Sequence, residues 1–573
     1  MSFAAPSTDG PSLSFIEGAL TFICVGLAFA FPAIGKPIFV AIERTGNAFA
    51  RHKLLSGMLV GLALLGLRLA MLPWLPIPLP YSADDFSFAL AADTFLHGRL
   101  TNPTPAMWVH FETIHVDMRP TYMSMYFPGQ ALAMAAGKLL FGHPWFGLLA
   151  ASAVMCSSVC WALQAWLPAR WALLGGTLCV VHLGLFTYWT NTFGGSGSIS
   201  AAAGAMVFGA LPRFTRGARL RYAMLMALGA AVLLISRPYE GFLLCLPVVI
   251  YLIVWLAKAR AKFGAVRLAR AALPALTLLC AAAVWLGYYN HRVFGNPLTL
   301  PYTVNRANYA VAPYYIWQSP RAVPQYNHEE MRRFYLINEL DGFKKVHSAP
   351  GFIPQTLLKP VSGFLFFGGL AFIPLVFLLR RSLRDRRMRF IAVCLAVLTA
   401  GLVIEIYFIP HYIAPFTVGI YLIAVQCMRH LRQWRPGDKQ VGLALSRFMV
   451  AICLFMAVLR VFDRPLHLEV VNFPPSNWTD RWYGPDLLGV KHAEAIGHMN
   501  QLPGRQLALV RRGKHEDLLD QWVYNSADID TSKVIWAWDM GPEKNRELLD
   551  YYKDRKVWLV QPDTDPVSIS PYR

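Results

Sequence analysis

Long apolar segments separated by short polar ones run from residue 13 to residue 461. Runs of about 17–25 apolar residues have the length that a helix needs to cross a bilayer. The pattern predicts a polytopic α-helical membrane protein with about twelve spans, some of them short for a hydrocarbon core of about 30 Å. The spans are expected near residues 13–33, 54–79, 145–166, 171–190, 198–212, 222–236, 241–257, 271–289, 353–379, 390–409, 413–428 and 448–461.

The short polar segments indicate how the chain is oriented. Basic residues cluster in segments that should face the cytoplasm, because positive loops are retained there. Residues 129–142 (GQALAMAAGKLLFG) are apolar, but a crossing there would put these clusters on opposite faces. We therefore expect an amphipathic helix on the outer interface. Residues 80–144 and 290–352 then form outer loops. The basic clusters are Arg44–Lys53, Arg213–Arg221, Lys258–Arg270, Arg380–Arg389 and Arg429–Arg447.

The tail from residue 463 has no apolar span. Short β-like runs alternate with polar helical segments there, which is typical of a small α/β domain. We predict a transmembrane body over 1–462 and an extracytoplasmic α/β domain over 463–573. The predicted strands are Leu507–Val510, Val534–Trp538 and Val557–Val560, and the predicted helices are Asp486–Asn500 and Glu543–Arg555.

Composition narrows the function classes. The 573 residues are 55% hydrophobic and 15% charged, whereas a soluble domain carries about 25% charge. The net charge of +20 lies in the short inter-helix segments, so it signals topology and not nucleic-acid binding. All nine cysteines fall in apolar segments without a CxxC pair, which argues against disulfides and thiolate metal sites. No basic residue precedes Lys36, so the first apolar segment is interpreted as a retained span.

The first outer loop is unusually rich in Asp, His, Arg and aromatic residues. Asp84 and Asp85 follow the second predicted span, and either could serve as a general base at the membrane face. The alternative is that they cap the helix that follows, together with Ser82. Two adjacent carboxylates point in different directions, so one is expected to face substrate while the other orients a partner.

Other residues of this loop suggest ion or phosphate binding. His110, Glu112 and His115 could contribute to a divalent metal site, although their spacing matches the HExxH zinc signature only loosely. Ordinary polar loop residues give the same pattern. Arg119 could hold a lipid phosphate or simply contact a headgroup. No other cofactor is indicated.

A second group of candidates lies on other outer segments. Arg237 and Glu240, in SRPYEG, could pair structurally or hold a phosphate or sugar. The loop 290–352 interleaves aromatic and polar residues, as carbohydrate sites and interfacial aromatic belts both do. The GGSGS stretch at 194–198 is interpreted as a turn with a helix cap. Further candidates for substrate contacts are Arg292, Arg306, Tyr309 and His411.

These features resemble the GT-C glycosyltransferases, membrane enzymes that use polyprenyl-phosphate sugars and include protein O-mannosyltransferases and lipid A aminoarabinose transferases. The resemblance is carried by Asp84-Asp85 after a span, by the Phe127-Pro128-Gly129 turn before an interfacial helix, by the many spans and by the outer C-terminal domain. The segments LAADTFLHGRLTNPTPAMWVHFET, SRPYEG and WVYNSADID are similar to a group of uncharacterised bacterial membrane proteins. Many relatives have Asp-Glu at the acidic pair and a double proline at the turn, so this chain departs at both places.

The resemblance implies an inverting glycosyltransferase of the bacterial inner membrane. It implies a polyprenyl-phosphate sugar donor, an extracytoplasmic acceptor (a cell-envelope glycan, lipid or protein) and Asp84 as the base. A transporter or flippase is the alternative. It would need ionisable groups inside the spans, whereas most ionisable groups lie at span ends, with Arg68 and Glu405 as exceptions. A scaffold protein is a third interpretation. In the tail, Trp522, Asn525 and Asp528 are candidate acceptor contacts, with local turn capping as the alternative.

Overall fold

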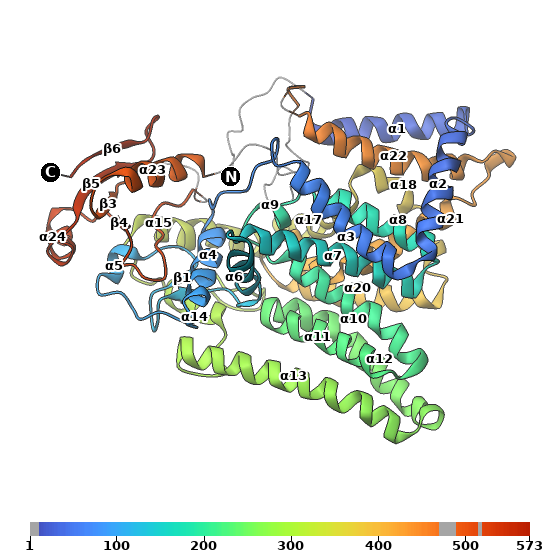
Figure 1. The fold of residues 1–573 in the computed structure, drawn as a ribbon, viewed down its shortest axis with the longest axis horizontal. Helices are drawn as coiled ribbons and strands as arrows, with labels where there is room; N and C mark the ends of the chain where they lie inside the picture. Colours follow the sequence, from blue (N-terminus) through green and yellow to red (C-terminus); the bar gives the residue numbers. More distant parts are fainter. Residues whose placement is uncertain (1–10, 464, 469–488, 514–517, 519, 573) are drawn as a thin grey trace.

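The computed structural model of the protein describes residues 11–463, 465–468, 489–513, 518 and 520–572. Long helices fill the chain up to residue 461, and a small sheet with two helices follows, at the left of Figure 1. The predicted fold class, a helical membrane protein with a small α/β region at its C-terminus, is confirmed.

Eight helices among the described residues are long and apolar enough to cross a membrane. A ninth span results if residues 350–368 and 370–376, which meet at 96°, count as one. The predicted number of about twelve is not confirmed, although each predicted span contains a helix. The eight are α1 (Leu13–Ala30), α3 (Lys53–Ala70), α7 (Trp145–Trp166), α12 (Pro238–Phe263), α13 (Ala265–Phe294), α20 (Arg386–Ile404), α21 (Thr417–Leu431) with the turn η4 (Pro410–Phe416) before it, and α22 (Val441–Val461).

Shorter elements complete the body. The helix α2 (Lys36–Arg51) was not predicted, because its basic residues indicated a connecting segment; its Glu43 accepts hydrogen bonds from Arg432 at 2.8 and 2.9 Å. The others are α8 (Ala169–Cys179), η1 (Val180–Gly184), α9 (Tyr188–Asn191), α10 (Gly197–Gly217), α11 (Leu220–Ser236), α14 (Pro301–Tyr309), α15 (Glu329–Arg332), η2 (Arg333–Asn338), α16 (Glu339–His347), α17 (Ala349–Gly368), η3 (Leu370–Phe372), α18 (Ile373–Val376), α19 (Leu379–Ser382) and η5 (Pro436–Asp438).

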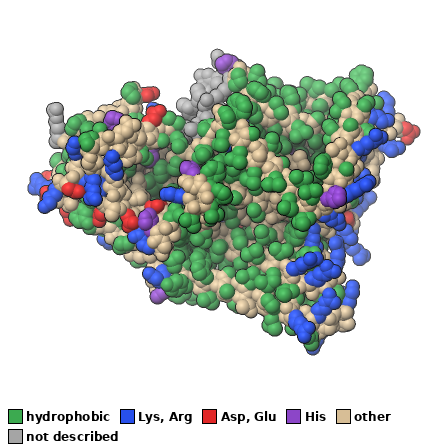
Figure 2. Space-filling view, in the orientation of Figure 1, with side chains coloured by type: hydrophobic (Ala, Val, Ile, Leu, Met, Phe, Trp, Pro, Cys, Tyr) green, Lys and Arg blue, Asp and Glu red, His purple; other side chains and the backbone are tan. Residues whose placement is uncertain are grey.

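The outer surface of the body is suited to lipid. Large apolar side chains on several spans are exposed, for example Phe22 (81%), Leu273 (63%) and Val284 (71%). A soluble protein does not expose apolar surface on this scale. Figure 2 shows apolar side chains across the middle of the molecule, with Lys and Arg gathered at the end opposite the C-terminal region. The chain is therefore a multi-pass membrane protein.

The predicted first outer loop, residues 80–144, is folded into a compact layer. It contains α4 (Ala83–Leu96), α5 (Trp108–Phe111), the antiparallel strands β1 (Val116–Asp117) and β2 (Met123–Ser124), and α6 (Gly129–Phe141). The predicted helix over 129–142 is present, and Leu139, Leu140 and Phe141 at its end are largely exposed, as an interfacial helix requires. A Cβ on Gly147 would lie 1.9 Å from the Ala133 carbonyl oxygen, so this glycine permits α6 to pack directly on α7.

The C-terminal region forms a four-stranded sheet in the order β4-β3-β5-β6. The three predicted strands are present, parallel to one another, and β6 is an additional antiparallel edge strand. The predicted second helix is confirmed in a shorter form, and residues 486–488 of the first lie outside the described residues. The elements are α23 (Val490–Gln501), β3 (Gln506–Val510), β4 (Val534–Trp538), α24 (Pro542–Tyr551), β5 (Lys556–Gln561) and β6 (Ser568–Pro571).

Candidate active site

Asp85 has a structural role at the start of α4. Ser82 is the N-cap, and its hydroxyl accepts a hydrogen bond from the Asp85 backbone N–H (3.3 Å) while Asp85 Oδ2 accepts from the Ser82 backbone N–H (3.0 Å). This reciprocal capping box satisfies two backbone donors at the helix start. Asp85 Oδ1 accepts a further bond from the Phe193 backbone N–H (2.8 Å). Both oxygens of Asp85 are thus engaged in the fold, which leaves Asp84 as the candidate base.

Asp84 points in a different direction from its neighbour. Its Oδ1 lies 2.7 Å from His115 Nδ1 and accepts a hydrogen bond from the Tyr126 hydroxyl. No hydrogen bond to Oδ2 is found among the described residues. The Asp84 side chain keeps 14% of its surface exposed. One carboxylate oxygen is thus fixed by two donors, and the other is open to a ligand.

The environment keeps Asp84 ionised. Burial by itself would raise the pKa of the Asp84 carboxyl. The hydrogen bonds from His115 and Tyr126 favour the charged form more strongly, so the pKa lies below its usual value. For the adjacent Asp85, burial outweighs the hydrogen bonds at the cap and raises the pKa.

His115 is held in place by the hairpin of the outer loop. It precedes β1 and has a positive φ of 64°, a strained conformation for a residue with a side chain. Its carbonyl oxygen accepts hydrogen bonds from the Ser87 hydroxyl (2.7 Å) and the Met125 backbone N–H (3.2 Å). These contacts, to α4 and to the residue after β2, fix the imidazole beside Asp84.

The glycine pair of the GGSGS stretch lies between Asp84 and Arg237. A Cβ on Gly194 would lie 3.0 Å from Asp84 Cβ and 3.8 Å from its Oδ2. The Gly195 carbonyl oxygen accepts a hydrogen bond from Arg237 Nη2 (3.1 Å). As predicted, the stretch is a turn that leads into a helix, α10. Its glycines allow the backbone to pass close to the carboxylate and the guanidinium.

Arg237 is buried and incompletely paired. Its Nη1 lies 3.3 Å from Glu240 Oε1, and its guanidinium stacks on the Tyr412 ring at 4.9 Å. Its Nε has no hydrogen-bond partner among the described residues. A buried N–H of a charged group needs an acceptor, so the vacant donor suits an anion next to Asp84.

His411 belongs to the same group of residues. Its Nδ1 lies 2.9 Å from the Tyr188 hydroxyl, and Gly195, at a φ of +95°, packs against both side chains. Tyr302 lies on the other side, with its ring 5.7 Å from that of Tyr126. The structure thus brings Asp84, Asp85, Arg237, Glu240 and His411 together around Gly194 and Gly195.

Arg306 and Tyr309 lie one layer away. Arg306 forms a two-pronged ion pair with Glu339 (2.7 Å to each oxygen) and stacks on the Tyr314 ring at 4.7 Å. Tyr314 in turn contacts Tyr302 (6.2 Å between rings), so Arg306 reaches Asp84 only through intervening aromatic residues.

The residues suggested as metal ligands do not converge. His115 contacts Asp84, while Glu112 accepts hydrogen bonds from Tyr309 (3.1 Å) and Asn327 (2.6 Å). His110 is buried under the C-terminal domain. Within the described part of the chain, no three His, Cys, Asp or Glu side chains are grouped as a metal requires. The spacing of these three residues along the sequence could not reveal this, because it does not say which way each side chain points in the fold.

Two arginines of the predicted set lie elsewhere. Arg119 is exposed and stacks on the Trp108 ring at 4.0 Å. Arg292, also exposed, donates a hydrogen bond to the Tyr288 hydroxyl (2.9 Å). Arg68, inside a span, is satisfied by Asn191 (2.9 Å) and by the Leu75 carbonyl oxygen (2.7 Å). These arginines have structural or surface contacts and do not reach Asp84.

The C-terminal domain packs on the outer loop at the end of the molecule that carries Asp84 (Figure 1). Trp538 Nε1 donates to the Glu112 carbonyl oxygen (2.7 Å), and Arg99 pairs with Asp528 (2.8 Å). Trp522 is 1% exposed in the domain core, and the Asn525 side chain bonds to both backbone groups of a neighbouring strand residue. The three candidate acceptor contacts therefore have structural partners.

Tyr126 and Tyr188 were missed by the sequence analysis. Tyr126 directly precedes the Phe127-Pro128-Gly129 turn, but only the tertiary fold shows that its hydroxyl reaches Asp84. Tyr188 follows a π-helical turn inside a span, where a tyrosine is easily taken for an interfacial aromatic. The Ser82-x-x-Asp85 spacing, by contrast, was a usable signal for the capping box.

No protein-family model matches the sequence, and no curated protein matches it. Solved structures that resemble it include ArnT from Cupriavidus metallidurans bound to undecaprenyl phosphate (13% identity, TM-score 0.44, 88% of this chain and 92% of that chain). Another is the oligosaccharyltransferase AglB from Archaeoglobus fulgidus, with an inhibitory peptide and a dolichol-phosphate (10% identity, TM-score 0.45, 89% and 69%). The apo A. fulgidus oligosaccharyltransferase also matches (11% identity, TM-score 0.43), and there the alignment covers 81% of this chain but 62% of that chain.

Proposed function

We propose that the protein is an inverting glycosyltransferase that moves a sugar from a polyprenyl-phosphate donor to an acceptor outside the cytoplasm. The observation that carries the proposal is that an ionised carboxylate and a buried guanidinium lie on either side of two glycines. Asp84 offers an open oxygen, and Arg237 offers an unpaired N–H. Transfer from a lipid phosphate needs both a group for the acceptor proton and a cation for the leaving phosphate.

In the proposed step, an acceptor hydroxyl binds to Oδ2 of Asp84. Its oxygen attacks the anomeric carbon of the donor, and the bond from that carbon to the phosphate oxygen breaks. The electron pair leaves with the polyprenyl phosphate, and the acceptor proton passes to Asp84. The lowered pKa of Asp84 keeps the carboxylate charged, so it orients the nucleophile first and takes the proton late, when the hydroxyl has become acidic.

Arg237 is proposed to hold the departing phosphate. Its Nε is a free donor, and its other bonds, to Glu240 and Gly195, fix the plane of the guanidinium. A preorganised donor of this kind stabilises charge that develops in the transition state. His411 packs against Gly195 of the same turn and would contact the phosphate or the sugar.

The proposal is tested with Asp84→Asn in purified full-length protein. Transfer from a panel of undecaprenyl-phosphate pentoses and hexoses to envelope acceptors should fall about 10²–10⁴-fold, the usual contribution of a general base. Binding of undecaprenyl phosphate should persist, because Asn keeps the shape of the side chain. Asp438→Asn, an exposed change elsewhere, is the control. Unchanged transfer in Asp84→Asn would refute the proposal, and transport of the lipid without any transfer would favour a flippase.

We further propose that the Asp84 end and the C-terminal domain face away from the cytoplasm of a bacterial inner membrane. The basic clusters lie at the other end of the body, where the positive-inside rule places the cytoplasm (Figure 2). Protease added to intact spheroplasts should remove the tail from residue 463. Cleavage only after lysis would reverse the orientation.

A further inference from the structure

A pocket lies at the end of the body remote from Asp84. It has a volume of about 480 Å³ and opens between the ends of α7, α10, α20 and α21. The other end of α7 bonds to Thr190, α10 begins two residues after Gly195, and α21 follows the turn that contains His411, so these ends lie on the side of the candidate active site. Because α7 has 22 residues, the pocket lies about 33 Å from the Asp84 end, roughly the thickness of a bilayer core. The pocket is therefore separate from the candidate active site.

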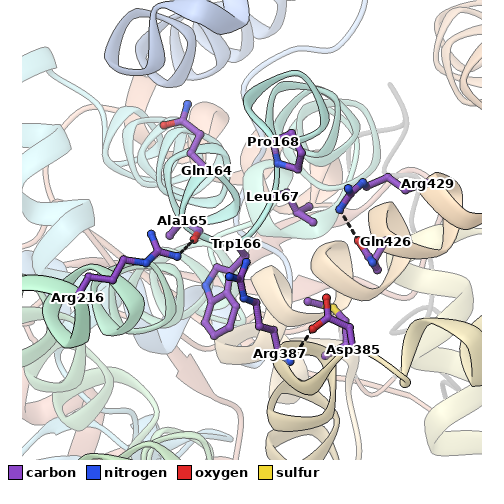
Figure 3. A pocket seen from close by; sticks show the side chains of 11 residues that line it. Gln164, Ala165, Trp166, Leu167, Pro168, Arg216, Asp385, Arg387, Gln426 and Arg429 are labelled. Atoms are coloured by element: carbon purple, nitrogen blue, oxygen red, sulfur yellow. Dashed lines mark hydrogen bonds between the residues drawn. The ribbon is translucent and has the colours of Figure 1, made fainter.

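Three arginines from three helices surround the pocket (Figure 3). Arg216 comes from the last turn of α10, Arg387 from the first turn of α20, and Arg429 from the last turns of α21. The single carboxylate at the pocket, Asp385, caps α20 by accepting a hydrogen bond from the Arg387 backbone N–H (2.9 Å). The pocket thus carries an excess of positive charge.

The arginines have donors to spare. Arg216 donates one bond, to the Ala165 carbonyl oxygen (2.9 Å), and Arg429 donates one, to Gln426 Oε1 (2.7 Å). In the described part of the chain, none of the three forms a salt bridge, and no side-chain hydrogen bond of Arg387 is found. A guanidinium has five N–H donors and matches phosphate oxygens in pairs.

We propose that this pocket binds the phosphodiester headgroup of an anionic phospholipid of the cytoplasmic leaflet. Basic pockets between transmembrane helices at this depth take such headgroups. The surface that lines the pocket is almost entirely polar, which suits a headgroup and not an acyl chain. A topology signal alone would explain exposed arginines, but it does not require three of them to converge on one cavity. The bound lipid would tie α7, α10, α20 and α21 together at this face.

The test uses full-length protein delipidated in a neutral detergent. Phosphatidylglycerol is titrated, with phosphatidylcholine and inorganic phosphate in parallel, and bound lipid is counted by native mass spectrometry. We expect saturable binding of phosphatidylglycerol that raises the thermal unfolding midpoint. Each of Arg216→Gln, Arg387→Gln and Arg429→Gln should weaken binding about fivefold, as the contribution of one basic residue to anionic lipid predicts.

A triple pocket variant combines Arg216→Gln, Arg387→Gln and Arg429→Gln. Its matched control removes the same number of charges outside the pocket, by Arg219→Gln, Arg384→Gln and Arg386→Gln together. This control variant should bind phosphatidylglycerol as the wild type does. Equal losses in control and pocket variants would show a diffuse charge effect and overturn the proposal. Equal stabilisation by inorganic phosphate would reassign the pocket to a free phosphate compound. If the triple pocket variant does not fold, the single variants decide the question.

Discussion

The hydroxyl of Tyr126 should set the pH at which Asp84 becomes active, and Tyr126→Phe removes that hydroxyl with little change of shape. Tyr126 donates to the carboxylate oxygen that also meets His115. A hydrogen bond to a charged group contributes about 1.5–3 kcal/mol, and one pKa unit corresponds to about 1.4 kcal/mol. Loss of the donor disfavours the charged form and raises the pKa of Asp84. The acid limb of kcat/KM should therefore move upward by about one to two pH units.

The measurement is a pH profile of sugar transfer between pH 4 and 9, at substrate levels well below KM, so that kcat/KM of the free enzyme is reported. Tyr552→Phe is the matched control, because its hydroxyl also meets an aspartate, Asp530, but in the C-terminal domain. That variant should keep the acid limb of the wild type. A Tyr126→Phe enzyme with reduced activity and an unmoved acid limb would show that the limb belongs to another group, and the assignment of Asp84 as the titrating base would fail.

Two further predictions concern Arg237 and the C-terminal domain. Arg237→Lys keeps the charge, but the lysine cannot bond to Gly195 and Glu240 at once. The kcat for transfer should therefore fall at least about tenfold, with a smaller change in KM. An unchanged kcat would show that Arg237 does not stabilise the transition state. His492 is buried between Trp522 and Trp536, and burial lowers its pKa to about 3. Because this folded-state pKa is depressed, stability should fall as pH drops from about 6.5 towards 3, seen as a change in tryptophan fluorescence. His492→Leu should flatten that dependence, whereas the exposed-site change His498→Asn should leave it, and the reverse pattern would contradict the assignment.

The sequence predicted features that depend on short-range pattern. Apolar runs located the eight helices that are long and apolar enough to cross a membrane, and the parity of basic clusters identified residues 129–142 as an interfacial segment, which forms α6. Short β-like apolar runs located three strands of the C-terminal sheet. Each of these features is set by the period of apolar residues within one element, so neighbours along the chain suffice to predict it.

The composition of the site could not be predicted in the same way. Asp84 meets His115 and Tyr126, which are 31 and 42 positions away, and Arg237 joins the group through the carbonyl of Gly195. Such contacts depend on how the outer loop folds over the ends of the spans. The same reason explains why His110, Glu112 and His115, which are close in sequence, do not converge on one site: their side chains face different neighbours.

The two carboxylates at the start of α4 differ in how far helix-capping rules can explain them. The spacing from Ser82 to Asp85 fits a capping box, so helix-capping rules alone can assign Asp85 to the fold. The same rules assign no structural role to Asp84. A charged carboxylate beside a membrane costs free energy unless neighbouring groups stabilise its charge. His115, Tyr126 and the charge of Arg237 supply that stabilisation in the folded protein. Three stabilising groups from three separate segments, gathered around an acid that the helix cap does not use, support the proposed role of Asp84 as the base.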